Sequence, residues 1–500
     1  MLSASKHVNR KAQIDLLREA LAYIRSVGSM FQTVFEYVGI PTIGKTTLIH
    51  MLAGVCNDEN VPFAHIDFDP KVNSHASNYR EKSVLLLVDL AAQLGIVRGQ
   101  LLDAIEAHEQ SLPIVNREQQ EKGQRKLIQA FREQVEHLLT QDPIVFLFDT
   151  TEQTHPSVLA FLEEEIISPL TQKGRCLFIF TGRAPIHWRR FEVRRRVRTE
   201  RLKPFDPESI ADQLEHEQVA TEDMKQLSNQ IYHLTGGLPY GNFVISRHLN
   251  KLAAEGEPLD LKTFQGHKPE LLDALIKDVM EHYVFSGIDQ NYQEACYVLA
   301  LVRQFDLIML RRLISKFVLA FKEHPRNAYG GLLGKLNATY LIEWDDTRKG
   351  YSVDPTLRRI LGQSVRLRNP KRYITINREA LDVYRDWITR VADYRSIYIV
   401  EALYHEACLA CMGETCDFTD LLNSFDHYLD QYGDEEPDLK GSMLQRLEME
   451  LRSNLKSDKP GSLGAILPMF IKEKLCSRIS TRREEVSYQL STAESVQRKE

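Results

Sequence analysis

The sequence predicts an α/β fold built on a parallel, three-layered sheet, followed by regions that are mostly helical. Short apolar segments alternate with helical segments over the first two hundred residues, and a glycine-rich loop joins the first apolar segment to a helix. Beyond residue 204, amphipathic helical spacing predominates. The predicted strands are 33–38, 63–70, 144–148 and 176–181, and the predicted helices include 83–94 and 117–139.

Composition narrows the class of protein. A chain of 500 residues is long enough for several domains, and its 43% hydrophobic and 26% charged residues are typical of globular proteins. The 63 basic and 69 acidic residues give a net charge of -6, which provides no overall basic field for nucleic acid. Seven cysteines do not form a dense disulfide framework. Because the amino terminus lacks a secretory apolar stretch and no segment approaches the roughly 18 apolar residues of a membrane span, we expect a cytoplasmic protein without a membrane partner.

The loop VGIPTIGKTT, residues 38–47, has the spacing G-x-x-x-x-G-K-T between a strand and a helix. In a P-loop of this kind the backbone N–H groups surround a phosphate, Lys45 reaches the β- and γ-phosphates, and the Thr46 hydroxyl ligates Mg²⁺. The alternative is a glycine-rich turn with an exposed lysine. The loop predicts binding of ATP or ADP with Mg²⁺ by Gly39, Ile40, Pro41, Thr42, Ile43, Gly44, Lys45, Thr46 and Thr47.

Charged residues follow two later strands. Asp149 ends the strand 144–148, Glu152 lies three residues further on, and Arg183 follows the strand 176–181. Because the carboxyl ends of parallel strands meet at one edge of a sheet, all three side chains are expected near the loop. Asp149 is placed to hold Mg²⁺ through water, Glu152 to orient the attacking water, and Arg183 to contact the γ-phosphate. Taken singly, an aspartate after a strand is more often a helix N-cap than a metal ligand, and the alternative for Arg183 is a surface arginine in a tight turn; together with Lys45 the functional interpretation is favoured.

Five segments in a fixed order resemble the STAND class of P-loop ATPases, the relatives of NACHT and NB-ARC proteins within the AAA+ group. They are VNRKAQIDLL from residue 8, FDTTE, which is similar to the Walker B form of bacterial members, TGRAPIHW, LTGGLPYGN at 234–242, and YSVDPTLRRIL at 351–361. The last of these five segments resembles the winged-helix segment that follows the wing in this class. The resemblance implies that Val8, Asn9 and Arg10 contact adenine and that Pro239 and Asp354 contact the nucleotide.

Two residues depart from the pattern of this class. Thr42 stands where the family usually has a glycine, and threonine disfavours positive φ. Asp354 stands where relatives carry a histidine that touches the β-phosphate of ADP, and a carboxylate there would repel phosphate. Arg358 or Arg359 is then a possible substitute for that histidine.

The predicted domains follow from these motifs. We expect a P-loop nucleotide-binding domain at 1–203, a helical lid at 204–270 and a winged-helix domain at 271–365, in which LIEWDDTRKGYSV forms two short strands around a charged turn. A helical, solenoid-like region at 366–480 and a polar tail at 481–500 complete the chain. The predicted fold class is therefore an α/β P-loop NTPase followed by a helical lid, a winged helix and an all-α region.

Two further segments leave alternatives open. The basic run from Arg189 to Arg201 and the winged helix could each bind DNA, although the alternation of Phe191, Val193 and Val197 fits an edge strand with a solvated face. His405 with Cys408, Cys411 and Cys416 could bind zinc, or these residues could pack on one helix face.

The expected function is an ATP-binding and slowly hydrolysing switch. The resemblance implies a role in signalling or defence, with nucleotide-dependent homo-oligomerisation and a separate effector protein as partner. The first alternative is an AAA+ loader or remodelling ATPase that acts on DNA. The second is a scaffold or transcription regulator in which the nucleotide is structural.

Overall fold

A computed structural model describes residues 9–80, 83–111, 117–346, 348–413, 416–432, 437–457 and 461–497. Val8, one of the expected adenine contacts, lies outside these residues. The chain divides into two compact units, Met1–Val219 and Ala220–Glu500, and the division falls inside the segment expected to form the lid. In the part of the chain that the structure describes, no helix has both the length and the apolarity needed to cross a bilayer.

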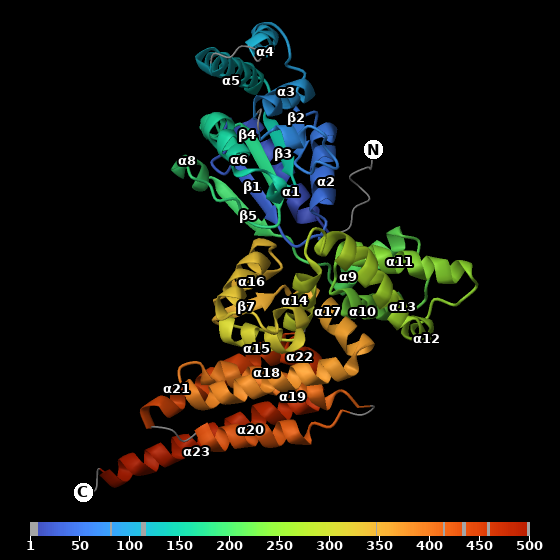
Figure 1. The fold of residues 1–500 in the computed structure, drawn as a ribbon, viewed down its shortest axis with the longest axis vertical. Coiled ribbons are helices and arrows are strands. Elements are labelled where there is room, and N and C mark those ends of the chain that lie inside the picture. Colours follow the sequence, from blue (N-terminus) through green and yellow to red (C-terminus); the bar gives the residue numbers. More distant parts are fainter. Residues whose placement is uncertain are drawn as a thin grey trace. The chain divides into compact units, whose positions relative to one another are not determined.

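The first unit contains a five-stranded sheet in which every neighbouring pair is parallel (Figure 1). Its order is β2-β3-β4-β1-β5, so β4 lies between the strand of the glycine loop and the strand that ends in Asp149. The predicted α/β P-loop NTPase fold is confirmed. The strands are β1 (Val34–Val38), β2 (Phe63–Asp67), β3 (Ile144–Asp149), β4 (Cys176–Gly182) and β5 (Val197–Arg201).

The sheet is the centre of the core of this unit. Every residue of β1, β3 and β4 is buried, as expected for parallel strands covered on both faces. Aromatic side chains stack across neighbouring strands, with ring centroids 5.2 Å apart for Phe146 and Phe178 and 4.8 Å apart for Phe148 and Phe180. The helices are α1 (Lys11–Val27), α2 (Lys45–Asp58), α3 (Ser83–Gln93), α4 (Gln100–Ser111), α5 (Arg117–Leu139), α6 (Pro156–Leu162), α7 (Ser168–Thr171), α8 (Phe191–Arg194) and α9 (Pro207–His216), with the 3-10 turns η2 (Ala76–Asn78) and η3 (Thr151–Gln153) and the π-helical segment η4 (Glu163–Ile167).

The prediction that the whole basic run forms an edge strand is wrong for its first half. Residues 191–194 form the helical turn α8, and only 197–201 form the edge strand β5. Phe191 is 63% exposed while Val193 is fully buried, so the two side chains do not share a face as residues i and i+2 of a strand would. The apolar alternation here is too short to distinguish a strand from one helical turn followed by a strand.

The second unit is helical apart from one antiparallel hairpin among the described residues. The two predicted strands around a charged turn are confirmed as β6 (Ile342–Asp345) and β7 (Gly350–Val353). A bridge between Phe305 and Tyr351 extends the pairing. The hairpin follows α14 (Gln290–Leu299), α15 (Leu307–Phe317), η6 (Leu319–Phe321) and α16 (Arg326–Ala338).

Helices precede and follow this group. Before it come α10 (Met224–Thr235), α11 (Pro239–Ala254), α12 (Leu261–Gly266), α13 (Lys268–Leu275) and the π-helical η5 (Ile276–Val284). After it come α17 (Pro355–Arg368), α18 (Pro370–Arg390), α19 (Arg395–Ala410), α20 (Thr419–Tyr432), α21 (Pro437–Lys456), α22 (Leu463–Ile466) and α23 (Met469–Gln497). The helix α23 thus continues through 481–497, where a polar tail is expected from the sequence.

Candidate nucleotide-binding site

The glycine loop connects β1 directly to α2, as a phosphate-binding loop requires. Gly44 has φ of 92° and precedes the first residue of α2, Lys45. A Cβ on Gly39 would lie 3.1 Å from Ile43 Cγ2, so glycine at position 39 allows the loop to close on itself. Thr46 and Thr47 are exposed in the first turn of α2. The loop therefore places its backbone and the helix N-terminus at the carboxyl end of β1.

Thr42 occupies a strained position in this loop. Its φ is 64°, in the left-handed region that β-branched residues rarely adopt, and its hydroxyl donates to Pro41 O at 2.6 Å. Thr150, which follows Asp149, has φ of 58°. Two of the seven described non-glycine residues with positive φ, Thr42 and Thr150, therefore flank the same edge of the sheet, and strain of this kind is concentrated at functional sites.

Lys45 is buried and turns back onto its own loop. Its Nζ donates to Gly39 O at 2.9 Å and to Ile40 O at 3.0 Å. Burial lowers the pKa of Lys45 to about 8. The positive charge of Arg183 lowers this pKa further, whereas the negative charges of Glu152 and Asp149 raise it. These electrostatic influences show that the structure brings together the four charged residues that the sequence assigns to one site. Carbonyl oxygens hold the ammonium group where phosphate oxygens could replace them.

Asp149 ends β3 and is 1% exposed. Its Oδ1 accepts hydrogen bonds from Thr150 N at 2.8 Å and from the Thr181 hydroxyl. Its Oδ2 is buried and has no hydrogen-bond partner among the described residues. A buried carboxylate oxygen without a partner is costly, and a metal-bound water or an ion would satisfy it. With the exposed Thr46 hydroxyl as a second hard oxygen donor, these residues fit Mg²⁺.

Glu152 and Arg183 form an ion pair at this edge of the sheet. Arg183 Nε donates to Glu152 Oε1 at 3.1 Å, with both side chains largely buried. Glu152 Oε2 is buried and also lacks a hydrogen-bond partner in the described part of the chain. Gly182 allows the end of β4 to pack closely against η3, because a Cβ at position 182 would lie 2.2 Å from Thr151 Oγ1. Sequence reasoning assigned the two charged residues separate roles and did not anticipate that they contact each other.

Glu36 is a residue of the site region that sequence reasoning missed. It lies in β1 and is 2% exposed. Its Oε1 accepts from Trp188 Nε1 at 2.7 Å and from Ile186 N at 3.2 Å, and its Oε2 accepts from the Thr199 hydroxyl at 2.6 Å. Glu36 thus ties the segment after Arg183 to β1 and β5. An acidic residue inside the apolar run TVFEYV was the available signal.

Arg10 contacts the glycine loop with its side chain. One guanidinium nitrogen donates to Ile43 O at 2.7 Å and another to Lys203 O at 3.3 Å, while the group lies 5.3 Å from the centre of the Phe205 ring. Burial lowers its pKa to about 10, opposed by Glu200. Asn9, at φ of 58°, precedes it. Arg10 therefore supports the loop, and the adenine contact implied by the resemblance stays a prediction.

Two expected nucleotide contacts belong to the second unit. Pro239 is the first residue of α11. Asp354 is the N-cap of α17, and its Oδ1 accepts from Thr356 N at 2.9 Å and from Leu357 N at 3.3 Å. A helix-capping role accounts for an aspartate at this position without reference to phosphate. Their contacts with a nucleotide remain predictions.

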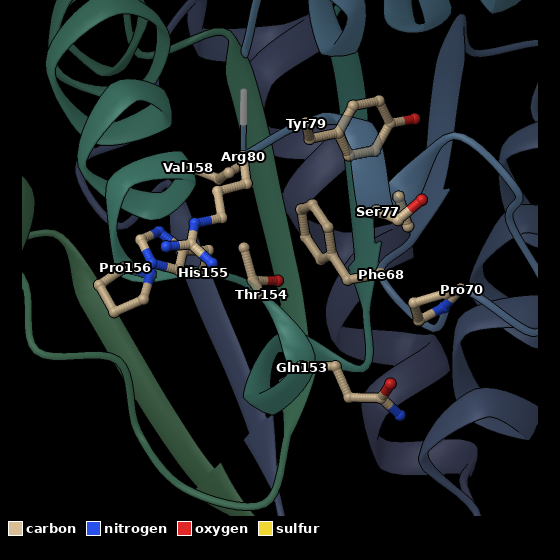
Figure 2. Close-up of a pocket in the computed structure, with 11 residues that line it drawn as sticks. Phe68, Pro70, Ser77, Tyr79, Arg80, Gln153, Thr154, His155, Pro156 and Val158 are labelled. Carbon is tan, nitrogen blue, oxygen red and sulfur yellow. The ribbon is translucent and has the colours of Figure 1, made fainter. Parts of the chain in front are cut away.

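A cavity of about 390 Å³ adjoins the ends of β2 and β3 (Figure 2). Phe68 and Tyr79 line one side, and Arg80, His155 and Pro156 line the other. The cavity also includes Gln153, the residue after Glu152, and Thr154, whose hydroxyl oxygen is buried without a hydrogen-bond partner among the described residues. The site region is therefore hollowed beside the acidic end of β3.

The cysteines near residue 408 do not form a metal centre in the described part of the chain. No group of three or more His, Cys, Asp or Glu side chains is arranged there to hold a metal ion. Cys408 is buried and its thiol pKa is raised by burial, while His405 Nδ1 lies 2.8 Å from Asn377 Oδ1. These side chains pack within the helical region, which was the alternative to zinc.

We compared the chain with known proteins in three ways. A scan against models of protein families finds no match, and a search of curated proteins finds none. Similar solved structures include the Holliday junction branch migration motor RuvB of Thermotoga maritima, with a TM-score of 0.34, 12% identity and coverage of 70% of this chain and 94% of that one. The ORC2 protein of Aeropyrum pernix in ADPNP and ADP complexes has a TM-score of 0.42 and 12% identity over 72% and 94% of the two chains. The ORC1 protein of Aeropyrum pernix in complex with DNA has a TM-score of 0.36 and 10% identity over 71% and 93%. Scores of this size do not assign a family or a function.

Proposed function

We propose that the chain is an ATPase that binds ATP or ADP with Mg²⁺ and hydrolyses ATP slowly. The observation that carries this proposal is the convergence of Lys45, Asp149, Glu152 and Arg183 on a glycine loop. Two buried carboxylate oxygens there, one on Asp149 and one on Glu152, have no partner among the described residues. A merely structural cluster would pair such oxygens, because leaving them unpaired costs about 1–3 kcal/mol each.

Each residue of the site has a separate role in binding the phosphates. Phosphate oxygens replace Gly39 O and Ile40 O as the partners of Lys45 Nζ, since charge-assisted hydrogen bonds are stronger than those to carbonyls. Thr46 and Asp149 would hold Mg²⁺, which would supply charge neutralisation at the β- and γ-phosphates. The loop N–H groups of residues 40–46 and the N-terminus of α2 orient the phosphates.

The ion pair between Glu152 and Arg183 gives a physical reason for slow turnover. While Glu152 Oε1 accepts from Arg183, the ion pair holds the carboxylate in one orientation and leaves only Oε2 to accept a proton from water. A γ-phosphate competes for the Arg183 guanidinium because it carries more negative charge than one carboxylate. Transfer of Arg183 to the phosphate then leaves Glu152 to orient the attacking water and accept its proton.

The test compares variants in nucleotide binding and in hydrolysis. Lys45→Met should abolish ATP binding measured by calorimetry, and Glu152→Gln should bind ATP with unchanged affinity but hydrolyse it at least 100-fold more slowly. The matched controls are Lys173→Met and Glu133→Gln, which alter exposed residues. If Lys45→Met binds ATP as tightly as the natural chain, the glycine loop is not the phosphate site and the proposal fails.

The nucleotide would act as a switch for assembly. Residues 204–270 would form the lid and 271–365 the winged-helix domain, and the bound nucleotide would set their orientation and expose surfaces for a homo-oligomer or a separate effector, in signalling or defence. Light scattering with ATP, with ADP and without nucleotide tests this. An ATP-dependent rise in particle mass that is absent in Lys45→Met supports the switch, and equal mass in all three conditions contradicts it.

A second candidate function is ATP-dependent action on DNA. The observation that favours it is the basic surface of α8 and β5, where Arg194, Arg195 and Arg198 are exposed on the edge strand and the turn before it. Phosphate contacts from several arginines would give affinity that falls steeply with salt. Duplex DNA should then stimulate hydrolysis, and Arg195→Gln with Arg198→Gln should reduce the salt dependence of binding in fluorescence anisotropy. If DNA neither binds nor stimulates hydrolysis, the DNA hypothesis is contradicted and the switch hypothesis remains. ADP that copurifies and cannot be exchanged would instead support a scaffold or transcription regulator.

A further inference from the structure

The cavity of about 390 Å³ beside the ends of β2 and β3 is separate from the glycine loop. Its described lining residues come from two segments of the first unit, 68–80, which follows β2, and 153–158, which joins η3 to α6. The volume falls within the range of about 300–1,000 Å³ that is typical of small-molecule sites. The cavity can therefore hold a small molecule without using the phosphate-binding loop.

One side of this cavity is aromatic. Phe68 is 3% exposed, and its ring stacks on Phe148 with centroids 6.0 Å apart and meets the Tyr79 ring at 87°. The Tyr79 hydroxyl donates to Asp89 Oδ2 at 2.5 Å and accepts from Asn73 Nδ2 at 3.1 Å. Because the polar end of Tyr79 is already paired, this side offers the cavity two fixed rings, which favour a flat apolar body.

The opposite side offers hydrogen-bond donors. Arg80 is exposed and forms no ion pair or side-chain hydrogen bond with a residue that the structure describes. The Nδ1 atom of His155 accepts from Ser157 N at 3.2 Å, so a neutral His155 carries its proton on Nε2 and donates from there. The described lining of the cavity includes no aspartate or glutamate. This side is therefore suited to a negatively charged group.

Thr154 contributes a hydroxyl that lacks a partner. Its Oγ1 is buried and has no hydrogen-bond partner among the described residues. Figure 2 shows Thr154 between the side formed by Arg80 and the side formed by Phe68. A buried hydroxyl that makes no hydrogen bond is unfavourable, and an oxygen atom of a ligand in the cavity would satisfy it.

The walls of the cavity are connected to the acidic end of β3. The backbone N–H of Phe68 donates to Asp149 O at 3.1 Å, so the aromatic side is attached to the residue that ends this strand. Gln153, which lines the cavity, directly follows Glu152 in η3. A ligand that contacts both segments would therefore restrain η3, and with it Glu152.

We propose that this cavity binds a small organic anion with a flat apolar body and one carboxylate or phosphate head, and that its binding changes the rate of ATP hydrolysis through η3. The body packs against Phe68 and Tyr79. The head accepts charge-assisted hydrogen bonds from Arg80 and His155 and a further hydrogen bond from Thr154. The regulatory part rests on the proposed ATPase function, whereas the binding part does not.

Three probes that share one ring system test the binding part on the full chain without nucleotide. They are indoleacetate, indoleacetamide and tryptamine, which carry a negative, a neutral and a positive head, and saturation-transfer NMR measures their titration. Indoleacetate should bind about tenfold or more tightly than indoleacetamide, and tryptamine should bind most weakly. Benzoate and phenyl phosphate, both titrated on Lys45→Met so that the glycine loop does not bind the phosphate, then distinguish a carboxylate head from a phosphate head.

Variants locate the binding in the cavity. Arg80→Gln should weaken indoleacetate about tenfold or more and leave indoleacetamide nearly unchanged, because only the charged head uses the guanidinium. Thr154→Val keeps the shape of the side chain, removes the unpaired hydroxyl and should also weaken indoleacetate. The matched control is Arg98→Gln, at an exposed arginine of the same unit outside the cavity lining, and it should bind as the natural chain does. Circular dichroism should show that every variant is folded.

The binding part is overturned if no probe binds saturably, if the three indoles bind equally, or if Arg80→Gln binds like Arg98→Gln. Saturating indoleacetate should change ATP hydrolysis by the natural chain about fivefold or more, and it should have no such effect on Arg80→Gln. Binding with an unchanged rate overturns the regulatory part alone. A chain that does not hydrolyse ATP contradicts the proposed function, while the titrations without nucleotide still decide the binding part.

Discussion

Replacing Lys45 with methionine should stabilise the protein in the absence of nucleotide while removing its ability to bind ATP. The ammonium group of Lys45 is buried, and its hydrogen-bond partners are two carbonyl oxygens, Gly39 O and Ile40 O. Burial lowers its pKa from 10.5 to about 8. The folded state therefore bears a cost for keeping this charge, and methionine has similar length without the charge.

The magnitude follows from the shift in pKa. A change from 10.5 to about 8 corresponds to about 3 kcal/mol of unfavourable free energy at pH 7. Methionine leaves Gly39 O and Ile40 O without the ammonium donor, which costs about 1–2 kcal/mol. The net gain is about 1–2 kcal/mol, or roughly 2–8 °C in the melting temperature of a unit of this size.

The pH dependence provides an independent check. The folded-state pKa lies below the ordinary value, so between about 8 and 10.5 the unfolded chain binds more protons, and the stability of the natural chain rises with pH through this window. The advantage of Lys45→Met should therefore shrink by about 2 kcal/mol between pH 7 and pH 9.5.

Scanning calorimetry of nucleotide-free protein at both pH values measures the effect. Lys71→Met, at an exposed position, serves as the control and should change the melting temperature little at either pH. A lower melting temperature for Lys45→Met at pH 7, or an advantage that does not change with pH, would refute the reasoning.

Two further variants test the supports of the site by urea denaturation. Trp188→Phe removes a hydrogen-bond donor from the buried Glu36 and should lower the free energy of unfolding by about 1.5–3 kcal/mol. The control is Trp344→Phe, because the Trp344 indole donates to Asp346 while its side chain is 49% exposed, and this change should cost less than 1 kcal/mol. Equal costs for the two variants would contradict the role of Glu36. Gly182→Ala places a methyl group 2.2 Å from Thr151 Oγ1 and should cost about 1–3 kcal/mol, whereas Gly54→Ala, in open space on α2, should be neutral or stabilising; a tolerated Gly182→Ala would show that η3 can move away from β4.

The sequence predicted which residues lie at the edge of the sheet because that inference needs only the ends of strands. Parallel strands present their carboxyl ends together, so Asp149 and Arg183 could be assigned to the neighbourhood of Lys45 from chain position alone. The helix at 117–139 was predicted to the residue, since its apolar spacing is long and regular. The hairpin 342–353 was predicted from two short runs around a charged turn.

The contacts between side chains could not be predicted, because they depend on the order of strands in the sheet. Only when β4 lies between β1 and β3 does Arg183 face Glu152, and strand order is a property of the whole unit. The left-handed conformation of Thr42 was recognised as a difficulty from the residue type, but whether the loop adopts it is decided by closure against Gly39 and Ile43. The basic run was mispredicted for the same reason. Its short apolar alternation fits a strand, and only the exposed Phe191 in the structure shows that the first half is a helical turn.

Glu36 shows both what the sequence indicates about the site and what only the structure reveals. A carboxylate in the middle of a buried strand is costly, so its presence requires donors that the sequence does not name. The structure supplies them from Trp188, Ile186 and Thr199, and two of these three lie on the segment that leaves Arg183. The segment that follows Arg183 is therefore held in place by β1, the same strand that leads into the glycine loop.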